Sequence, residues 1–293
     1  MLWEGREESD NVEDRRGMGG VGRMAVGGGG SVLLLILGLL FGFDPRALND
    51  MIGGRGGGGG GGPAPMSQTA PRQVDHTQDR AASFSKVILR DTELVWDDLF
   101  RQARRSYEPP RLVLFEGSVD SACGLAESAV GPFYCPGDRH VYLDLSFFRD
   151  MEAKLHSPGD FARAYVIAHE VGHHVQRLMG WSDPMDRARR GASRSETNRM
   201  SVQLELQADY LAGVWAHHGQ ERFHFLEQGD VESAMHAAFE IGDDRLQRQA
   251  RGYVVPDSFT HGTSAQRQKA FGDGLRTGDL AAAASFVQSA SRY

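Results

Sequence analysis

The sequence is poor in cysteine: only Cys123 and Cys135 occur among its 293 residues. This scarcity excludes small scaffolds held by several disulfides and zinc modules built on four cysteines. Basic residues are also in deficit, since 32 lysines and arginines stand against 39 aspartates and glutamates, giving a net charge of −7. Without a run of lysine or arginine, this balance argues against nucleic acid as a partner held through its phosphates.

Glycine, in contrast, is abundant and unevenly distributed. Of the 37 glycines, 19 fall between residues 17 and 62. Such a region cannot form a core, because glycine loses the most backbone entropy on folding and has no side chain to bury. We therefore expect a disordered tail at residues 1–23, a flexible glycine-rich linker at residues 44–71, and one globular domain at residues 72–293.

Residues 24–43 carry no charge, and from residue 31 onward they are almost continuously apolar. Twenty helical residues span about 30 Å, the thickness of a bilayer core, so the segment predicts a transmembrane anchor. A cleaved signal peptide and a buried helix are the alternatives. The first is disfavoured because no small-residue cleavage site follows, and the second because glycine-rich stretches isolate the segment.

The arginines around this segment predict its orientation. Three closely precede it and two closely follow it. This favours a single-pass cell-membrane protein with its N-terminus inside and its C-terminal domain outside the cytoplasm. In that compartment Cys123 and Cys135 could form a disulfide, and two unpaired buried thiols are the alternative.

The globular domain is predicted to be α+β, because strand patterns come early in it and helical patterns come late. Strands are expected at residues 111–115, 131–135 and 140–145, with the last two forming a hairpin. Helices are expected at residues 75–105, 147–155, 160–179, 193–217, 231–241, 264–276 and 280–290.

The chemistry is concentrated in the helix expected at residues 160–179, which contains a His-Glu-x-x-His pattern. His169 and His173 are four residues apart, so they share one helix face and can bind one zinc ion through imidazole nitrogens. Glu170 lies about 100° round the helix and can reach the open side of the metal without being a ligand. The neighbouring His174 points the wrong way and is expected to be structural or an outer-shell residue.

A catalytic zinc needs a third protein ligand. Glu205 is the strongest candidate, because it shares a face with Asp209 on another expected helix that carries small residues for close packing. Asp209 would then accept a hydrogen bond from the outer nitrogen of a ligand histidine. A solvated acidic pair is the ordinary alternative, and His217, His218 and Asp243 are weaker rivals as the third ligand.

Other segments complete a pattern around this motif. They are the apolar segment with its glycine linker, Asn11–Gly17, Cys123-Gly124, Gly131–Pro136, Val141–Asp144, Glu205–Trp215 and His261–Arg267. With them the chain resembles, over nearly its whole length, the membrane-associated neutral zinc metallopeptidases of the YpfJ type. The resemblance implies a zincin-like fold with one Zn²⁺ per chain and, by similarity to zincins with a glutamate ligand, Glu205 as the third ligand.

The expected function is hydrolysis of a peptide or protein substrate by a zinc-activated water, with Glu170 as the general base. Residues 141–145 are expected to pair with an extended substrate. His261 is either a catalytic oxyanion donor, an outer-shell residue or merely structural, since Thr263 and Gln266 next to it form a capping-box pattern. The alternative functions are a catalytically silent zinc-binding membrane scaffold and a membrane-tethered adaptor without metal.

Overall fold

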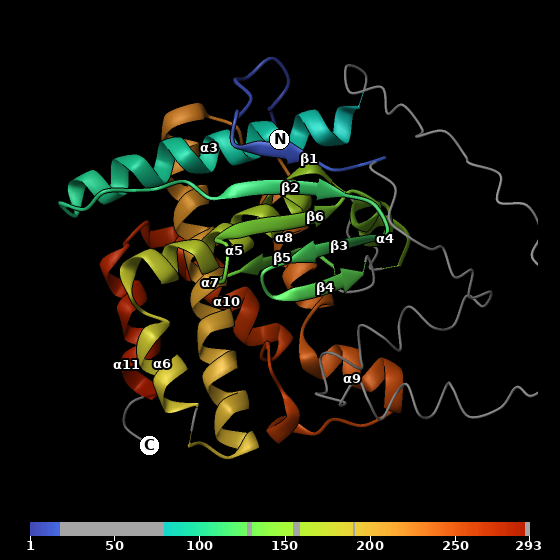
Figure 1. The fold of residues 1–293 in the computed structure, drawn as a ribbon, viewed down its shortest axis with the longest axis vertical. Coiled ribbons are helices and arrows are strands. Elements are labelled where there is room, and N and C mark those ends of the chain that lie inside the picture. The colour runs from blue at the N-terminus through green and yellow to red at the C-terminus, as the bar shows by residue number, and fades with distance from the viewer. Residues whose placement is uncertain (18–78, 128–130, 155–158, 190, 291–293) are drawn as a thin grey trace, which may run out of the picture.

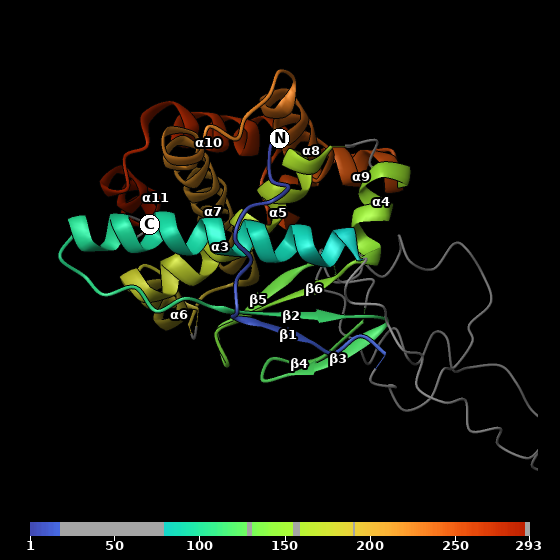
Figure 2. The ribbon, with the colours of Figure 1, turned by 90° about the horizontal axis from the view of Figure 1, so that it is seen from above.

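The computed structural model describes residues 1–17, 79–127, 131–154, 159–189 and 191–290. A small sheet lies at the centre of these residues, with the long helices on one of its faces and a β-hairpin on the other (Figure 1; Figure 2). The described residues are mostly helical, so the predicted α+β class with a small sheet is confirmed.

The main sheet has four strands in the order β1-β2-β6-β5. Their bounds are Val12–Asp14 for β1, Arg111–Phe115 for β2, His140–Asp144 for β6 and Phe133–Cys135 for β5. β1, β2 and β6 are parallel, whereas β5 runs antiparallel to β6 as the predicted hairpin requires. β2 pairs with residues 140–144 of β6 on one side, and β5 pairs with residues 140–142 on the other. The expectation that residues 141–145 pair with substrate is therefore wrong for residues 141 and 142. The edge strand at this end of the sheet is β5.

Alternation along β2 explains why its sequence is apolar throughout. Leu112 and Leu114 pack into the large core shared with the helices. Val113 and Phe115 pack on the opposite face, under the hairpin of β3 (Ser118–Ser121) and β4 (Gly124–Glu127). A strand buried on both faces has no solvent side that would need polar residues.

The helices follow the predicted order. They are α3 (Arg80–Gln102), α4 (Ser146–Lys154), α5 (Asp160–Met179), α6 (Asp183–Ala188), α7 (Arg194–Phe223), α8 (Asp230–Glu240), α9 (Asp243–Arg251), α10 (Ser264–Thr277) and α11 (Ser285–Ala290), with short 3₁₀ turns at Pro256–Ser258 and Ala281–Ala284. The α5 bounds equal the predicted ones. The short elements β1, β3, β4, α6 and α9 were not predicted.

Small residues set the helix spacing around α7. At Gly172 of α5, an added Cβ would lie 3.0 Å from the carbonyl oxygen of Ala208 on α7, so these two helices are in near-backbone contact. On the other side of α7, a Cβ on Gly213 would overlap the backbone of α10, and one on Gly274 of α10 would overlap the backbone of α7. α7 is therefore closely packed between α5 and α10.

The N-terminal residues correct the expectation of a disordered tail at residues 1–23. Trp3 is 6% exposed and donates its indole N–H to Asp160 at 2.8 Å. Arg6 forms an ion pair with the buried Asp91 of α3 at 2.5 Å. Together with the pairing of β1, these contacts place the first 17 residues inside the domain, which does not begin at residue 72 as expected. The remainder of the expected tail lies outside the described residues.

The predicted localisation is also wrong. β1 precedes the apolar segment at residues 24–43 and β2 follows it, yet the two strands pair in one sheet. A single membrane crossing would place them on opposite sides of the bilayer, which rules out an N-terminus inside and a domain outside the cytoplasm. Residues 24–43 themselves lie outside the described residues. Among the described helices, none is both long enough and apolar enough to cross a membrane.

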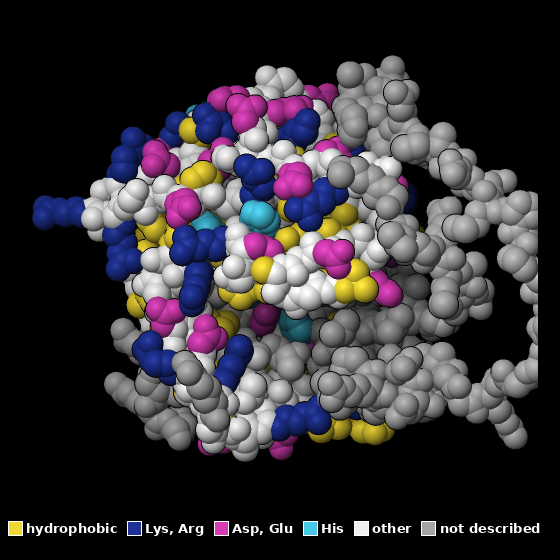
Figure 3. Space-filling model, in the orientation of Figure 1, with side chains coloured by type: hydrophobic (Ala, Val, Ile, Leu, Met, Phe, Trp, Pro, Cys, Tyr) yellow, Lys and Arg dark blue, Asp and Glu magenta, His cyan; other side chains and the backbone are white. Residues whose placement is uncertain are grey.

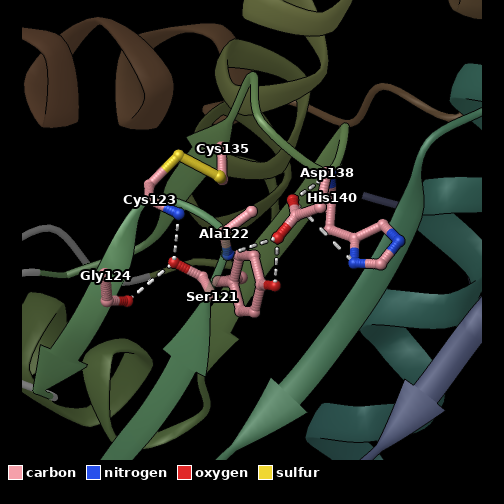
Figure 4. Close-up of a disulfide and its surroundings, with 8 residues drawn as sticks. Ser121, Ala122, Cys123, Gly124, Cys135, Asp138 and His140 are labelled. Atoms are coloured by element: carbon pink, nitrogen blue, oxygen red, sulfur yellow. Dashed lines mark hydrogen bonds and ion pairs between the residues drawn. A yellow bond between two sulfur atoms is a disulfide. The ribbon is translucent and has the colours of Figure 1, made fainter.

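Cys123 and Cys135 are joined by a disulfide that ties the β3–β4 hairpin to the edge strand β5 (Figure 4). The Asp138 carboxylate supports this junction, since it accepts hydrogen bonds from the Ala122 N–H at 2.9 Å and the Tyr142 hydroxyl at 2.8 Å. The hairpin is thus held on the sheet by a covalent bond and a polar contact as well as by apolar packing.

The surface shown in Figure 3 mixes charges of both signs: lysine and arginine side chains are interspersed with aspartate and glutamate. A mixed surface creates no extended field that would attract a ligand of one sign. Selectivity on this side of the molecule therefore has to come from a shaped and chemically specific site.

Candidate metal centre

α5 and α7 together form a compact cluster of metal-binding side chains. His169 and His173 lie one turn apart on α5, and their Nε2 atoms face the Glu205 carboxylate of α7 at 3.2 and 3.5 Å. One ligand atom from each of these residues lies within 4.8 Å of the others. The contact between Gly172 and Ala208 brings the two helices close enough for Glu205 to reach the histidines.

Hydrogen bonds at the outer nitrogens orient both imidazole rings. The Nδ1 of His169 lies 2.8 Å from an oxygen of Asp209, which accepts its proton. The Nδ1 of His173 lies 3.0 Å from the side-chain oxygen of Gln176. The amide nitrogen of Gln176 donates to a backbone carbonyl of α7, so its oxygen is the atom left to accept from His173. Each ring therefore directs its Nε2 at Glu205.

Nitrogen atoms with lone pairs cannot face a carboxylate closely unless a cation lies between them. Burial lowers the pKa of His169, but the carboxylates of Asp209 and Glu205 outweigh burial and raise this pKa to about 10. Burial raises the pKa of Glu205, but the histidines around it hold it well below its usual range. The cluster thus retains positive charge, and a metal ion can replace the protons. Two imidazoles and one carboxylate with an open side are the donor set of a catalytic zinc.

Behind the cluster lies a buried ion pair that the sequence did not reveal. Arg267 of α10 donates two hydrogen bonds to Asp209, at 2.8 and 2.9 Å, and both side chains are fully enclosed. The Tyr165 hydroxyl donates to the same carboxylate at 2.5 Å. Burial raises the pKa of Asp209, but the positive charges of Arg267 and His169 outweigh burial and lower this pKa to about 2. Asp209 therefore stays ionised and holds the His169 ring, as predicted for it.

A signal for Arg267 exists in the sequence. Ala270, Phe271 and Gly274 follow it at spacings of three, four and seven residues, so an arginine occupies the buried face of a helix. A buried arginine requires an anionic partner, which Asp209 provides. Tyr165 and Gln176 carry no comparable signal, because both residue types are ordinary at the buried face of a helix.

Glu170 lies in the same cavity as the three candidate ligands, without contacting a ligand atom directly. The cavity measures about 400 Å³ and is bounded on one side by the edge strand β5 and the residues before it. Glu170 is 8% exposed, and burial raises the pKa of its carboxyl group. The backbone of Tyr134 in β5 and the histidines of the cluster act in the opposite direction on this pKa, but burial outweighs them.

His261 also lines this cavity. Its Nδ1 lies 2.9 Å from the Thr260 hydroxyl and 3.4 Å from a carboxylate oxygen of Asp243. The capping box of Thr263 and Gln266 is present as well. The segment from His261 to Gln266 therefore does both things that the sequence suggested. It caps the start of α10, and it places a histidine at the cavity.

The rival ligands lie elsewhere. Asp243 receives the backbone N–H groups of residues 260–262 on one oxygen, so it organises the loop that carries His261. His217 and His218 lie further along α7 against the end of α10. His174 hydrogen-bonds a backbone carbonyl and the Tyr134 hydroxyl, which supports the expected structural role.

Comparison with known protein families assigns the chain to a family. A family model described as "Putative neutral zinc metallopeptidase" matches residues 1–286. The chain belongs to this family. The match includes the N-terminal residues that form β1, in agreement with their place in the sheet.

Curated relatives of this chain are similar in sequence. "Uncharacterized protein YpfJ" from Escherichia coli strain K12 is 47% identical over 296 residues, covering 99% of this chain and 100% of the relative. "Uncharacterized protein Rv2575" from Mycobacterium tuberculosis is 42% identical over 193 residues, covering 62% of this chain and 64% of the relative. No solved structure matches the chain. The recognised resemblance to the YpfJ type is thus confirmed.

Proposed function

We propose that this chain is a zinc-dependent peptidase that binds one catalytic Zn²⁺ at His169, His173 and Glu205 and uses Glu170 as its general base. The observation that carries the proposal is the position of Glu170. A buried carboxylate that is no ligand faces the same cavity as a complete ligand set. A structural zinc site has four protein ligands and no need for such a group, whereas a hydrolytic site requires both an open position and a base.

The metal ion and the side chains around it have separate roles in the proposed reaction. Zinc, when bound, supplies Lewis-acid polarisation of a carbonyl group and acidification of water. Glu170 accepts a proton from the attacking water and delivers it to the leaving amine, and its raised pKa brings it closer to neutral pH, where proton transfer in both directions is efficient. Burial lowers the pKa of His261, but the carboxylates of Glu205 and Asp243 outweigh burial and raise this pKa. The resulting imidazolium, with Nδ1 held by Thr260 and Asp243, has an Nε2–H to donate toward the developing oxyanion.

The proposed substrate is an extended segment of peptide or protein. β5 is an edge strand, and it borders the cavity that contains Glu170. An extended peptide can add to such an edge through backbone hydrogen bonds, which bind regardless of sequence. Phe133 and Phe147 line the cavity beside the strand and would contact apolar side chains of that peptide.

The experiment compares the full-length, untagged wild-type chain with Glu170→Gln in zinc content and casein hydrolysis. A control variant, Glu152→Gln, changes an exposed glutamate that is 62% accessible. We expect one catalytic zinc in all three proteins, hydrolysis in wild type and control, and a loss of at least about 100-fold in Glu170→Gln. Zinc without hydrolysis in any protein would replace the peptidase by the silent zinc scaffold. A chain that folds but binds no zinc would refute the ligand set.

A further inference from the structure

A second group of metal-binding side chains lies on α7, away from the candidate catalytic centre. His217 Nε2 lies 3.4 Å from one oxygen of Glu221, and His218 Nδ1 lies 3.2 Å from the other. One donor atom from each residue lies within 4.8 Å of the others. At 1.5 Å per residue, the twelve residues between Glu205 and His217 separate the two groups by about 18 Å along the helix.

The remaining ring nitrogens of both histidines are occupied by backbone carbonyls. His217 Nδ1 lies 2.8 Å from the carbonyl oxygen of Leu275, and His218 Nε2 lies 2.8 Å from that of Gly278. A carbonyl oxygen can only accept, so these nitrogens carry the protons. The other nitrogen of each ring, Nε2 of His217 and Nδ1 of His218, faces the carboxylate of Glu221. This is the arrangement by which backbone carbonyls orient metal-binding histidines.

Two ring nitrogens and one carboxylate therefore converge on one point at the surface. Protons or a metal ion can bind between them. The carbonyls of Leu275 and Gly278 belong to the C-terminal end of α10, where the helix dipole is negative and a nearby cation is stabilised. Gly278 also makes room for the arrangement, because a Cβ there would overlap the ring of His217.

We propose that His217, His218 and Glu221 form a second site for a divalent transition-metal ion, with Zn²⁺ as its probe. Two imidazoles and a carboxylate suit this class of ion rather than Ca²⁺ or Mg²⁺, which prefer oxygen ligands. The histidines are each 27% exposed and Glu221 is 64% exposed, so water completes the coordination. A metal ion at this site would link the C-terminal part of α7 to the end of α10. The proposal does not depend on the proposed peptidase activity.

The ordinary explanation is that the two histidines only cap α10. Two substitutions separate capping from metal binding. His217→Asn retains a donor at the position of Nδ1, and His218→Gln retains one at the position of Nε2. Both variants keep the hydrogen bonds to the helix end and lose the inward nitrogen. Glu221→Gln removes the carboxylate charge at an exposed position. The matched control is His224→Asn, which changes an exposed histidine of the α7 C-cap that is not part of the cluster.

The experiment measures Zn²⁺ bound per chain by equilibrium dialysis of the full-length, untagged protein, with unfolding temperatures in chelator as the check on folding. We expect two Zn²⁺ in wild type and His224→Asn, and one in His217→Asn/His218→Gln. Glu221→Gln should weaken the second site at least about tenfold. Removing the first centre with His169→Asn/His173→Asn should leave one Zn²⁺, which the His217 and His218 substitutions then abolish.

The two proposals fail in different ways. If only the second site is absent, wild type binds one Zn²⁺ and His217→Asn/His218→Gln still binds one, which overturns this inference. If only the catalytic centre fails to bind, wild type binds one and His217→Asn/His218→Gln binds none. If the His217 and His218 substitutions unfold the chain, Glu221→Gln decides. Unchanged affinity in that variant would refute the site.

Discussion

Replacing Arg267 by methionine tests whether the buried ion pair behind the candidate metal centre holds a ligand in place. Methionine keeps most of the apolar volume and removes the guanidinium group. Asp209, which is 0% exposed, would lose two of its hydrogen bonds and its only cationic side-chain partner other than His169 among the described residues. Removing one member of a buried ion pair costs about 3–5 kcal/mol, because the other charge remains desolvated. That is a large part of a typical domain stability of about 5–15 kcal/mol.

The same substitution should weaken metal binding. Arg267 is the strongest of the groups that lower the pKa of Asp209 against the effect of burial. Without Arg267 this pKa rises, and a protonated Asp209 no longer orients the Nδ1–H of His169. Loss of such an outer hydrogen bond typically reduces metal affinity about 10- to 100-fold. The variant is thus expected to be both less stable and a weaker zinc binder.

Urea unfolding of the full-length chain in chelator, followed by circular dichroism, measures the first effect, and competition with a chromophoric chelator measures the second. Arg276→Met is the matched control, since Arg276 lies on the same helix and is 72% exposed. Arg267→Met combined with Asp209→Asn should recover part of the stability, because no buried charge is left unpaired. The reasoning is refuted if Arg267→Met unfolds within about 1 kcal/mol of wild type and binds zinc as tightly.

Three further predictions concern the fold. Gly213→Ala should cost at least about 1–3 kcal/mol because its Cβ would overlap the α10 backbone, whereas Gly272→Ala has free space and should not destabilise; equal urea midpoints would contradict this. Burial raises the pKa of Asp91 from 3.8 to about 7, so between these values the folded state holds the extra proton. The free energy of unfolding should then fall as pH rises, by up to about 1.4 kcal/mol per pH unit, and Asp91→Asn should remove this slope in urea titrations at pH 4–7. Replacing residues 18–78 by about ten Gly and Ser residues should change the stability by less than about 2 kcal/mol, but deleting residues 1–17 should cost more than about 3 kcal/mol. Similar unfolding midpoints for the two deletions would argue against a structural role for the N-terminus.

The sequence was sufficient to predict the elements whose formation depends mainly on residues close together in the chain. α5 has an apolar stripe, a glycine at its end and a metal motif at fixed spacing, and its bounds agree with the prediction. The hairpin of β5 and β6 has a Pro-Gly-Asp turn between two apolar runs, and it forms as expected. In both cases, about twenty consecutive residues contain all the features from which the element was predicted.

Non-local elements escaped prediction for a physical reason. β1 has the sequence Val-Glu-Asp and lies at the sheet edge, so only one side of it pairs and its composition resembles that of a polar tail. What holds this segment in place is Trp3 and the ion pair of Arg6 with Asp91, which is formed across 85 residues. The ion pair of Asp209 with Arg267 spans 58 residues. Local periodicity places Arg267 on the buried face of α10, but it does not identify the distant partner in either ion pair.

The docking of the N-terminal residues also sets an order of events during synthesis. The N–H of Leu2 donates to the carbonyl of Phe225, and β1 pairs with a strand about 100 residues further along the chain. Ribosomes add roughly 5–20 residues per second. Leu2 therefore waits on the order of 10–45 s for its partner Phe225. Docking of the N-terminal residues is accordingly completed late, after both helices of the metal centre have been translated.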